Sequence, residues 1–208
     1  MRCPTVVCAG RLWRVVAAHG PGSDNAVMAE SSGWVVLVYR VPSEPSRLRA
    51  QVWRRLRQLG ALYLQNAVVA LPADPAAERS LLRLQEEITT EMGGSAQVFR
   101  AVALAGQEQV IASMNAARDE EYAEIVDRCR DFLTEIERET AATHFTYAEL
   151  EENEEDLNKL RSWFEKVRGR DRFDAGGAGE AEQRLAECAT VLEEFAARVY
   201  ARDSTQDV

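Results

Sequence analysis

The first strong pattern in the chain is an unbroken apolar run from Trp34 to Tyr39. The run is rich in β-branched and aromatic residues and contains no polar position. Such a run is typical of a strand that is buried on both faces. The sequence therefore predicts a central strand that ends before Pro42.

A helix is predicted next, between Ser43 and Gly60. The segment Ser43-Glu44-Pro45-Ser46 offers a capping hydroxyl, an early acid and a proline suited to a first turn. On a helical projection one face is apolar, with Trp53 at its margin, and the opposite face is cationic. The apolar face consists of Leu48, Val52, Leu56 and Leu59, and the cationic face of Arg47, Arg54 and Arg57.

Two short strands, a helix and a last strand complete this unit. The strands are predicted at 61–64 and 67–71, joined by a hairpin or bulge at Gln65-Asn66. The helix starts at the segment 72–75 and ends at Gly93-Gly94. Its inward positions are predicted to be Leu81, Leu82, Leu84 and Ile88. With a fourth strand at 95–104, the order predicts an α+β fold of the split βαβ type, a ferredoxin-like βαββαβ domain.

Helical periodicity replaces strand patterns after Leu104. Amphipathic helices are predicted at 107–143, with a break at 115–118, and at 146–167 and 180–202. Joined by shorter connections, they predict an antiparallel α-helical bundle or coiled-coil hairpin. Its core is expected to include Trp163, Phe164 and Phe195.

These patterns divide the chain into four segments. The predicted segments are a disordered N-terminal tail at 1–32, a ferredoxin-like domain at 33–105, a helical domain at 106–203 and a disordered tail at 204–208. Within the first segment, Met28 is an alternative start of translation, because MAESSGWVVLVYRVP resembles an ordinary N-terminus placed just before a strand.

The composition is that of a globular protein in a reducing compartment. No apolar run approaches the ~20 residues needed to cross a bilayer, so no membrane association is expected. Cys3, Cys8, Cys129 and Cys188 are scattered without a CxxC pair. We expect free thiols and a cytoplasmic location.

Charge is distributed unevenly along the 208 residues, whose formal net charge is −9. The acids concentrate after Arg118, whereas the segment 34–60 contains a single acid, Glu44. That segment carries Arg40, Arg47, Arg49, Arg54, Arg55 and Arg57. The cluster indicates either an anion-binding surface or an ordinary solvated helix face, since arginine is a good helix former.

Motifs for catalysis are missing from the sequence. GxSxG, HExxH and GxxxxGK[ST] do not occur, and His144 has no serine or cysteine arranged around it. Acid runs such as Glu151-Glu152 lack the spacing of a calcium loop. We expect no enzyme activity, no cofactor and no metal site.

The segments YRVPSEPSRLR and VWRRLRQLGALYLQN are long and distinctive. In these segments the chain resembles the N-terminal domain of the ChrB family, the regulators associated with bacterial chromate-resistance operons. The resemblance implies a role in transcription, with DNA as partner. It does not extend to the C-terminal domain that the family associates with chromate sensing. The region is also distantly similar to a small CRISPR-adaptation nuclease, but where that lineage has a metal-binding acid this chain has Tyr39-Arg40-Val41-Pro42.

Two further segments leave alternatives open. Arg118, Glu121 and Tyr122 form either a specific polar cluster against the first domain or ordinary helix-surface charges with one packed tyrosine, and we favour the second. The segment 168–177 is predicted to be a flexible turn, whose basic half is either a plain loop or a phosphate contact.

The residues support two functional hypotheses. In the first, the protein is a dimeric DNA-binding regulator in which Arg47, Arg54 and Arg57 neutralise phosphates, flanked by Arg40, Arg49 and Arg55. In the second, it is a protein–protein interaction module that does not bind DNA. The acidic helices then dock a partner, and the arginines pair with acids of the same molecule or of a second copy.

Overall fold

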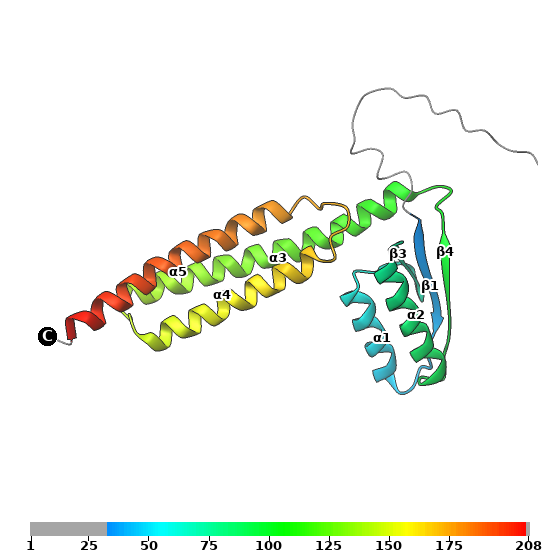
Figure 1. Cartoon of the computed structure of the whole chain (residues 1–208), viewed down its shortest axis with the longest axis horizontal. Helices are drawn as coiled ribbons and strands as arrows, with labels where there is room; N and C mark the ends of the chain where they lie inside the picture. Colours follow the sequence, from blue (N-terminus) through cyan, green and yellow to red (C-terminus); the bar gives the residue numbers. More distant parts are fainter. Residues whose placement is uncertain (1–32, 207–208) are drawn as a thin grey trace, which may run out of the picture. The chain divides into compact units, whose positions relative to one another are not determined.

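The structure, a computed structural model, describes residues 33–206, with side chains up to Asp203 (Figure 1). The predicted tail at 1–32 and the alternative start at Met28 lie outside the described residues. Within them the fold is α+β, with a four-stranded antiparallel sheet and five helices. The elements follow one another as β1-α1-β2-β3-α2-β4-α3-α4-α5.

The strand β1 (Trp34–Arg40) lies in the middle of the sheet, as predicted. It pairs with β3 (Val68–Pro72) on one side and with β4 (Ser95–Ala101) on the other. The strand β2 (Leu62–Gln65) pairs with β3, and the sheet order is β2-β3-β1-β4. The register of β2 shifts between Tyr63 and Gln65, directly before the predicted hairpin or bulge at Gln65-Asn66.

The last strand is shorter than the run of apolar residues in the sequence suggests. It was predicted to reach Leu104, but β4 ends at Ala101. Val102 is 77% exposed and Leu104 is 99% exposed. Apolar residues that follow a strand directly cannot be told from strand residues by composition.

Two helices cover one face of the sheet. They are α1 (Ser46–Gln58) and α2 (Pro75–Thr90). The buried residues in this layer are Val35, Leu37, Val52, Leu56, Val69, Leu71, Ala77, Leu81, Leu84, Ile88, Met92 and Ala96. Oδ1 of Asp74 caps α2 by accepting hydrogen bonds from the backbone N–H groups of Ala76 and Ala77. The predicted capping hydroxyl of α1 is not observed, because Pro45 occupies the N-cap position.

The prediction that Leu82 points inward is wrong. Its side chain is 53% exposed, whereas the adjacent Leu81 is fully buried. Consecutive residues on a helix differ in direction by about 100°, so a pair of leucines cannot both face the centre of a narrow apolar stripe.

Three helices make up the rest of the described chain and run side by side (Figure 1). They are α3 (Gln107–Ala141), α4 (Tyr147–Arg168) and α5 (Ala178–Gln206). Phe164 and Phe195 are buried in their shared core, and Trp163 packs against it partly buried. The helix α5 runs to Gln206, into the segment predicted as a tail. No helix of residues 33–206 is long and apolar enough to cross a membrane.

The predicted break at 115–118 is wrong, because α3 is continuous over 35 residues. The first part of α3 packs on the second face of the sheet, where Met114 joins Trp34 and Ala70 in a buried cluster. Asn115, a weak helix former, donates from its side chain to the backbone carbonyl of Phe173 at 3.2 Å. These tertiary contacts outweigh the local preference for a break. They also explain why β1 is apolar on both faces.

Candidate nucleic-acid interface

All six arginines predicted to bind DNA are exposed. Five of them lie on α1, whose opposite face is fixed against the sheet by the fully buried Val52 and Leu56. Arg47 and Arg54 are seven residues apart, nearly two helical turns, so they project on the same side of α1. Burial of the apolar face thus turns these two guanidinium groups toward solvent.

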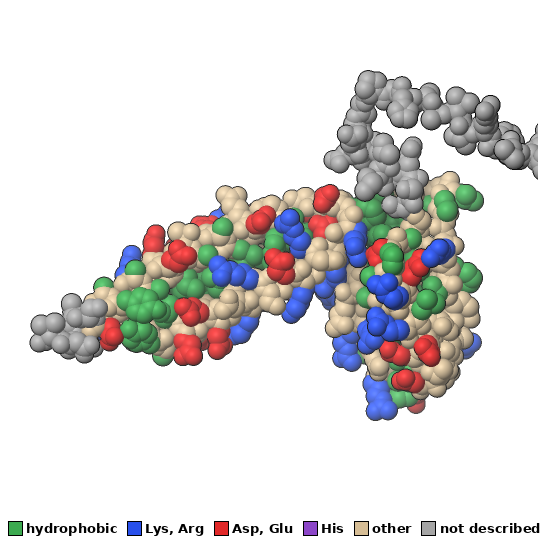
Figure 2. Space-filling view, viewed as in Figure 1, with side chains coloured by type: hydrophobic (Ala, Val, Ile, Leu, Met, Phe, Trp, Pro, Cys, Tyr) green, Lys and Arg blue, Asp and Glu red, His purple; other side chains and the backbone are tan. Residues whose placement is uncertain are grey.

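The arginines differ in whether an acid of the same molecule neutralises them. Nη2 of Arg55 lies 2.9 Å from Oε1 of Glu87 on α2. None of the ion pairs in residues 33–203 involves Arg40, Arg47 or Arg49, and none involves Arg54 or Arg57. Figure 2 shows Lys and Arg side chains on the surface over α1 and α2 with acidic side chains among them, and side chains of both signs along the three-helix part.

The structure does not bring all six arginines into one surface. Arg40, at the end of β1, lines a separate hollow of about 760 Å³ together with Glu44. Arg49 follows Arg47 by two residues and therefore projects from another side of the helix. The guanidinium of Arg57 lies 5.4 Å from the centre of the Trp53 ring, a cation–π contact. Arg47 and Arg54 remain as the outward-facing pair, which we call the α1 arginine pair.

A second charged site was missed by the preferred sequence interpretation. Arg118 and Glu121 are each 9% exposed and Tyr122 is fully buried, so these residues are not ordinary surface charges. Oε2 of Glu121 lies 3.0 Å from Nε of Arg118 and 3.0 Å from Nη2 of Arg170. We call Arg118, Glu121 and Arg170 the buried charge cluster.

Burial shifts the pKa values of Arg118 and Tyr122. Desolvation lowers the pKa of the Arg118 guanidinium, against the opposing influence of Glu121. Burial and the neighbouring Asp171 raise the pKa of Tyr122 to about 12, and its hydroxyl donates to Oδ2 of Asp171 at 3.2 Å. The tyrosine is therefore a neutral hydrogen-bond donor at physiological pH.

The connection between α4 and α5 contributes Arg170 to the buried charge cluster and forms further contacts with the rest of the chain. Arg172 pairs with Asp74 at 3.1 Å, and Arg168 pairs with Glu182 at 3.4 Å. The Phe173 ring lies 6.1 Å from the Trp34 ring on β1. Because Arg170 also pairs with Glu121, all three arginines of this segment have a carboxylate partner. The segment is thus a docked loop whose three arginines are each paired with a carboxylate of the same molecule.

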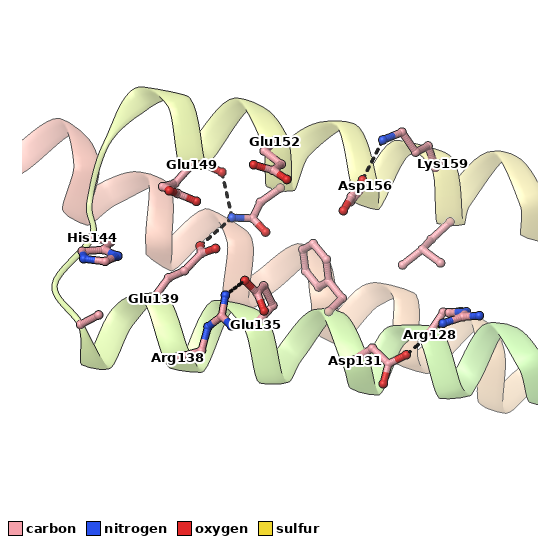
Figure 3. A pocket seen from close by; sticks show the side chains of 14 residues that line it. Arg128, Asp131, Glu135, Arg138, Glu139, His144, Glu149, Glu152, Asp156 and Lys159 are labelled. Carbon is pink, nitrogen blue, oxygen red and sulfur yellow. Dashed lines mark hydrogen bonds and ion pairs between the residues drawn. The ribbon is translucent and has the colours of Figure 1, made fainter.

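A hollow between α3 and α4 has a volume of about 870 Å³ (Figure 3). Six acids line it, against Arg128, Arg138 and Lys159. Glu139 is buried there, and its Oε2 accepts a hydrogen bond of 2.8 Å from Nδ2 of Asn153. Burial raises the pKa of Glu139, with Glu149 and Glu135 adding to the effect. No group of acids, histidines or cysteines in residues 33–203 has the arrangement of a metal site.

The fold and this surface define an α+β protein in which an antiparallel sheet, covered by an arginine-bearing helix, is followed by three long helices. The model of one protein family, described as Protein ChrB, N-terminal, matches residues 49–206, from within α1 to the end of α5. The chain belongs to this family. Among curated proteins no sequence matches the chain.

Proposed function

We propose that the protein is a DNA-binding transcription regulator, without enzyme activity, that contacts the DNA backbone through the α1 arginine pair. The observation that carries the proposal is that Arg47 and Arg54 are exposed on one side of α1 and form none of the ion pairs in residues 33–203. The family suggests a regulator of chromate resistance, and direct contact with DNA is a common way in which such regulators act.

The arrangement of the elements supports a fold assignment within this proposal. A βαββαβ order with the sheet order β2-β3-β1-β4 supports a ferredoxin-like domain at 33–105. The contacts among α3, α4 and α5 support an antiparallel bundle at 106–203. In this assignment α1 and α2 pack on one face of the sheet, and the first part of α3 packs on the other face.

The spacing of Arg47 and Arg54 along α1 is compatible with contacts to DNA phosphates. Seven residues of helix span roughly 10 Å, about three times the 3.4 Å rise between successive phosphates of one strand. Both guanidinium groups can therefore reach phosphates of the same duplex. Such contacts position a protein on DNA and do not read the base sequence.

The overall charge limits how the protein can approach DNA. With a net charge of −9, the molecule as a whole is repelled by a polyanion. The acids are concentrated on the helices after Arg118, so approach is favourable only with α1 foremost. We therefore expect strong dependence on salt and a single orientation on the duplex.

Titration of duplex DNA at several salt concentrations tests the proposal. The duplex is taken from upstream of the protein's own gene, and the variant is Arg47→Ala with Arg54→Ala. Each lost phosphate contact lowers the slope of log K against log salt by about 0.9. We expect the slope to fall by roughly 2 and the affinity to fall for all duplex sequences alike.

The matched control removes the same charge elsewhere. Arg161 and Lys166 are exposed on α4 and form none of the ion pairs in residues 33–203, so Arg161→Ala with Lys166→Ala tests for a general charge effect. If the wild-type protein fails to bind at low salt, or if both double variants behave alike, the proposal is wrong.

Absence of binding would favour the interaction-module hypothesis, in which the acidic helices dock a protein. That hypothesis expects the α1 arginines to pair with acids of the same molecule or of a second copy, and of the five only Arg55 has an acidic partner within residues 33–203. We include in the proposal that the regulator acts as a dimer. Sedimentation of the free protein and of its DNA complex checks this part independently of the arginine variants.

A further inference from the structure

A hollow of about 400 Å³ lies between the end of α1, the edge strand β2 and the helix α3. Its volume is within the range of sites for small organic ligands. Trp53, Arg57 and Tyr63 line it from the sheet side, and Arg118, Glu120 and Glu124 line it from α3. The phosphate contacts proposed above use none of these side chains.

Two aromatic rings border this hollow and remain accessible. Trp53 is 47% exposed and Tyr63 is 36% exposed. The guanidinium of Arg57 lies over the Trp53 ring, 5.4 Å from its centre, so the indole already accepts one planar cationic group on a face. The Tyr63 hydroxyl lies 3.1 Å from the Tyr39 hydroxyl, and this hydrogen bond restrains its ring.

The polar groups around the rings are of two complementary kinds. Arg57 and Arg118 present guanidinium donors. Arg118 is 9% exposed, and its Nε forms an ion pair with Glu121 but no aligned hydrogen bond. Glu120 and Glu124 are exposed acceptors one turn apart on α3, and none of the ion pairs in residues 33–203 involves them.

We propose that the hollow lined by Trp53, Arg57, Tyr63, Arg118, Glu120 and Glu124 binds the guanine base of a nucleotide. A planar base stacks on Trp53 and Tyr63, as bases do on aromatic side chains in many nucleic-acid-binding proteins. Guanine presents acceptors at O6 and N7, which arginine recognises. Its N–H groups are donors that a carboxylate accepts. Adenine offers no O6 acceptor, and pyrimidines offer a smaller stacking surface.

The position of the hollow supplies the phosphate contact. Arg54 lies one helical turn before Arg57 on α1 and faces solvent. Arg54 is therefore the candidate partner for the phosphate of a nucleotide whose base lies in the hollow. The same chemistry is offered by a free guanine nucleotide and by an unpaired guanine in a DNA strand. This inference rests on the proposed function where the ligand is a DNA strand.

Calorimetric titration of the full chain with guanosine 5′-monophosphate, and with the adenosine and cytidine monophosphates, tests the inference. A second titration compares a thymine octamer with the same octamer carrying one central guanine. We expect a preference for guanine in at least one of the two forms, and which form is preferred identifies the source of the base. Trp53→Ala is expected to weaken this binding about tenfold, the usual effect of one stacking contact.

The controls separate the site from general effects. Phe99→Ala removes another aromatic ring that is 52% exposed and does not line the hollow, and we expect it to bind as the wild type does. Glu124→Gln, a change at an exposed helix position, should lose the preference for guanine over adenine while the fold stays intact.

Absence of a guanine preference in both forms, or equal effects of Trp53→Ala and Phe99→Ala, overturns the inference. The two proposals fail separately. Duplex binding that depends on Arg47 and Arg54 without any guanine preference contradicts the guanine site alone. Binding of guanosine monophosphate without duplex binding contradicts the regulator proposal alone.

Discussion

Glu121 and Arg170 lie 49 residues apart in the sequence, yet Nη2 of Arg170 is 3.0 Å from Oε2 of Glu121. The same oxygen lies 3.0 Å from Nε of Arg118. One carboxylate therefore serves two guanidinium groups, and the side chains of all three residues are at most 17% exposed. This carboxylate joins α3 to the loop between α4 and α5.

Replacing Glu121 by glutamine should destabilise the protein strongly. The change leaves two largely buried guanidinium groups without their shared anion, and removal of one partner of a buried ion pair costs about 3 kcal/mol or more. The free energy of unfolding in urea, which does not screen charges, measures the effect. Glu124→Gln, one turn further on the exposed side, is the matched control. A loss no larger for Glu121→Gln than for this control would show that the cluster does not stabilise the fold.

Gly60 and Gly93 provide a paired test of how α1 meets the buried charge cluster. Both have a positive φ, 74° and 66°, so alanine at either position is strained by about 1 to 2 kcal/mol. A methyl group on Gly93 would have no neighbour within 4 Å. On Gly60 it would stand 2.9 Å from Nη1 of Arg118 and 3.1 Å from Cβ of Arg170.

We therefore expect Gly60→Ala to cost more than Gly93→Ala, by roughly 1 kcal/mol or more for the added overpacking. Urea unfolding of the two variants measures the difference directly. Equal losses would mean that Arg118 can move away from the turn at no cost, and the close contact would then have no energetic role.

Local patterns predicted the type and order of the strands and helices, but not the end of β4, the continuity of α3 or the buried charge cluster. The apolar run of β1 and the helical periodicity of apolar and cationic residues on α1 depend on residues close in sequence. The structure contains the strand and the two-faced helix where they were predicted. The exposure of Arg47 and Arg54 follows from the burial of Val52 and Leu56 on the same helix. Periodicity thus predicts which face a side chain occupies.

The partner of a charged residue cannot be deduced in this way. Arg118 and Glu121 have the spacing of an ordinary surface pair on a helix, and their burial depends on Gly60 and Arg170, which are distant in sequence. The sequence contains only weak signals that these charged residues are buried. Phe173 is an apolar residue in an otherwise polar loop, and it packs against Trp34. The same limit explains the predicted break near Asn115, where contacts with Phe173 sustain the helix.

Leu81 and Leu82 give a direct test of the corrected orientation of α2. Leu81 is fully buried and Leu82 is 53% exposed. Leu81→Ala should cost about 3 kcal/mol, since it leaves a cavity in the core. Leu82→Ala should change the free energy of unfolding by no more than about 0.5 kcal/mol. Urea unfolding curves of both variants decide between this orientation and the one predicted from the sequence, in which both losses would be large.

Glu139 should make stability depend on pH in a defined direction. Burial raises the pKa of its carboxyl in the folded protein above the ordinary value of 4.5. The folded state therefore binds this proton more tightly than the unfolded state does. The resulting stabilisation is fully present below pH 4.5 and is lost as the pH rises through the folded-state pKa. At neutral pH the charged Glu139 thus opposes folding.

Glutamine at position 139 keeps an acceptor for Asn153 and removes the charge. We expect Glu139→Gln to melt at a higher temperature than the wild type at pH 7, and this advantage to shrink as the pH is lowered toward 4.5. Thermal unfolding across this range measures the effect, with the exposed Glu137→Gln on the same helix as control. A difference that stays constant with pH, or grows toward acid, would mean that the hydrogen bond from Asn153 at 2.8 Å, and not desolvation, governs the ionisation of Glu139.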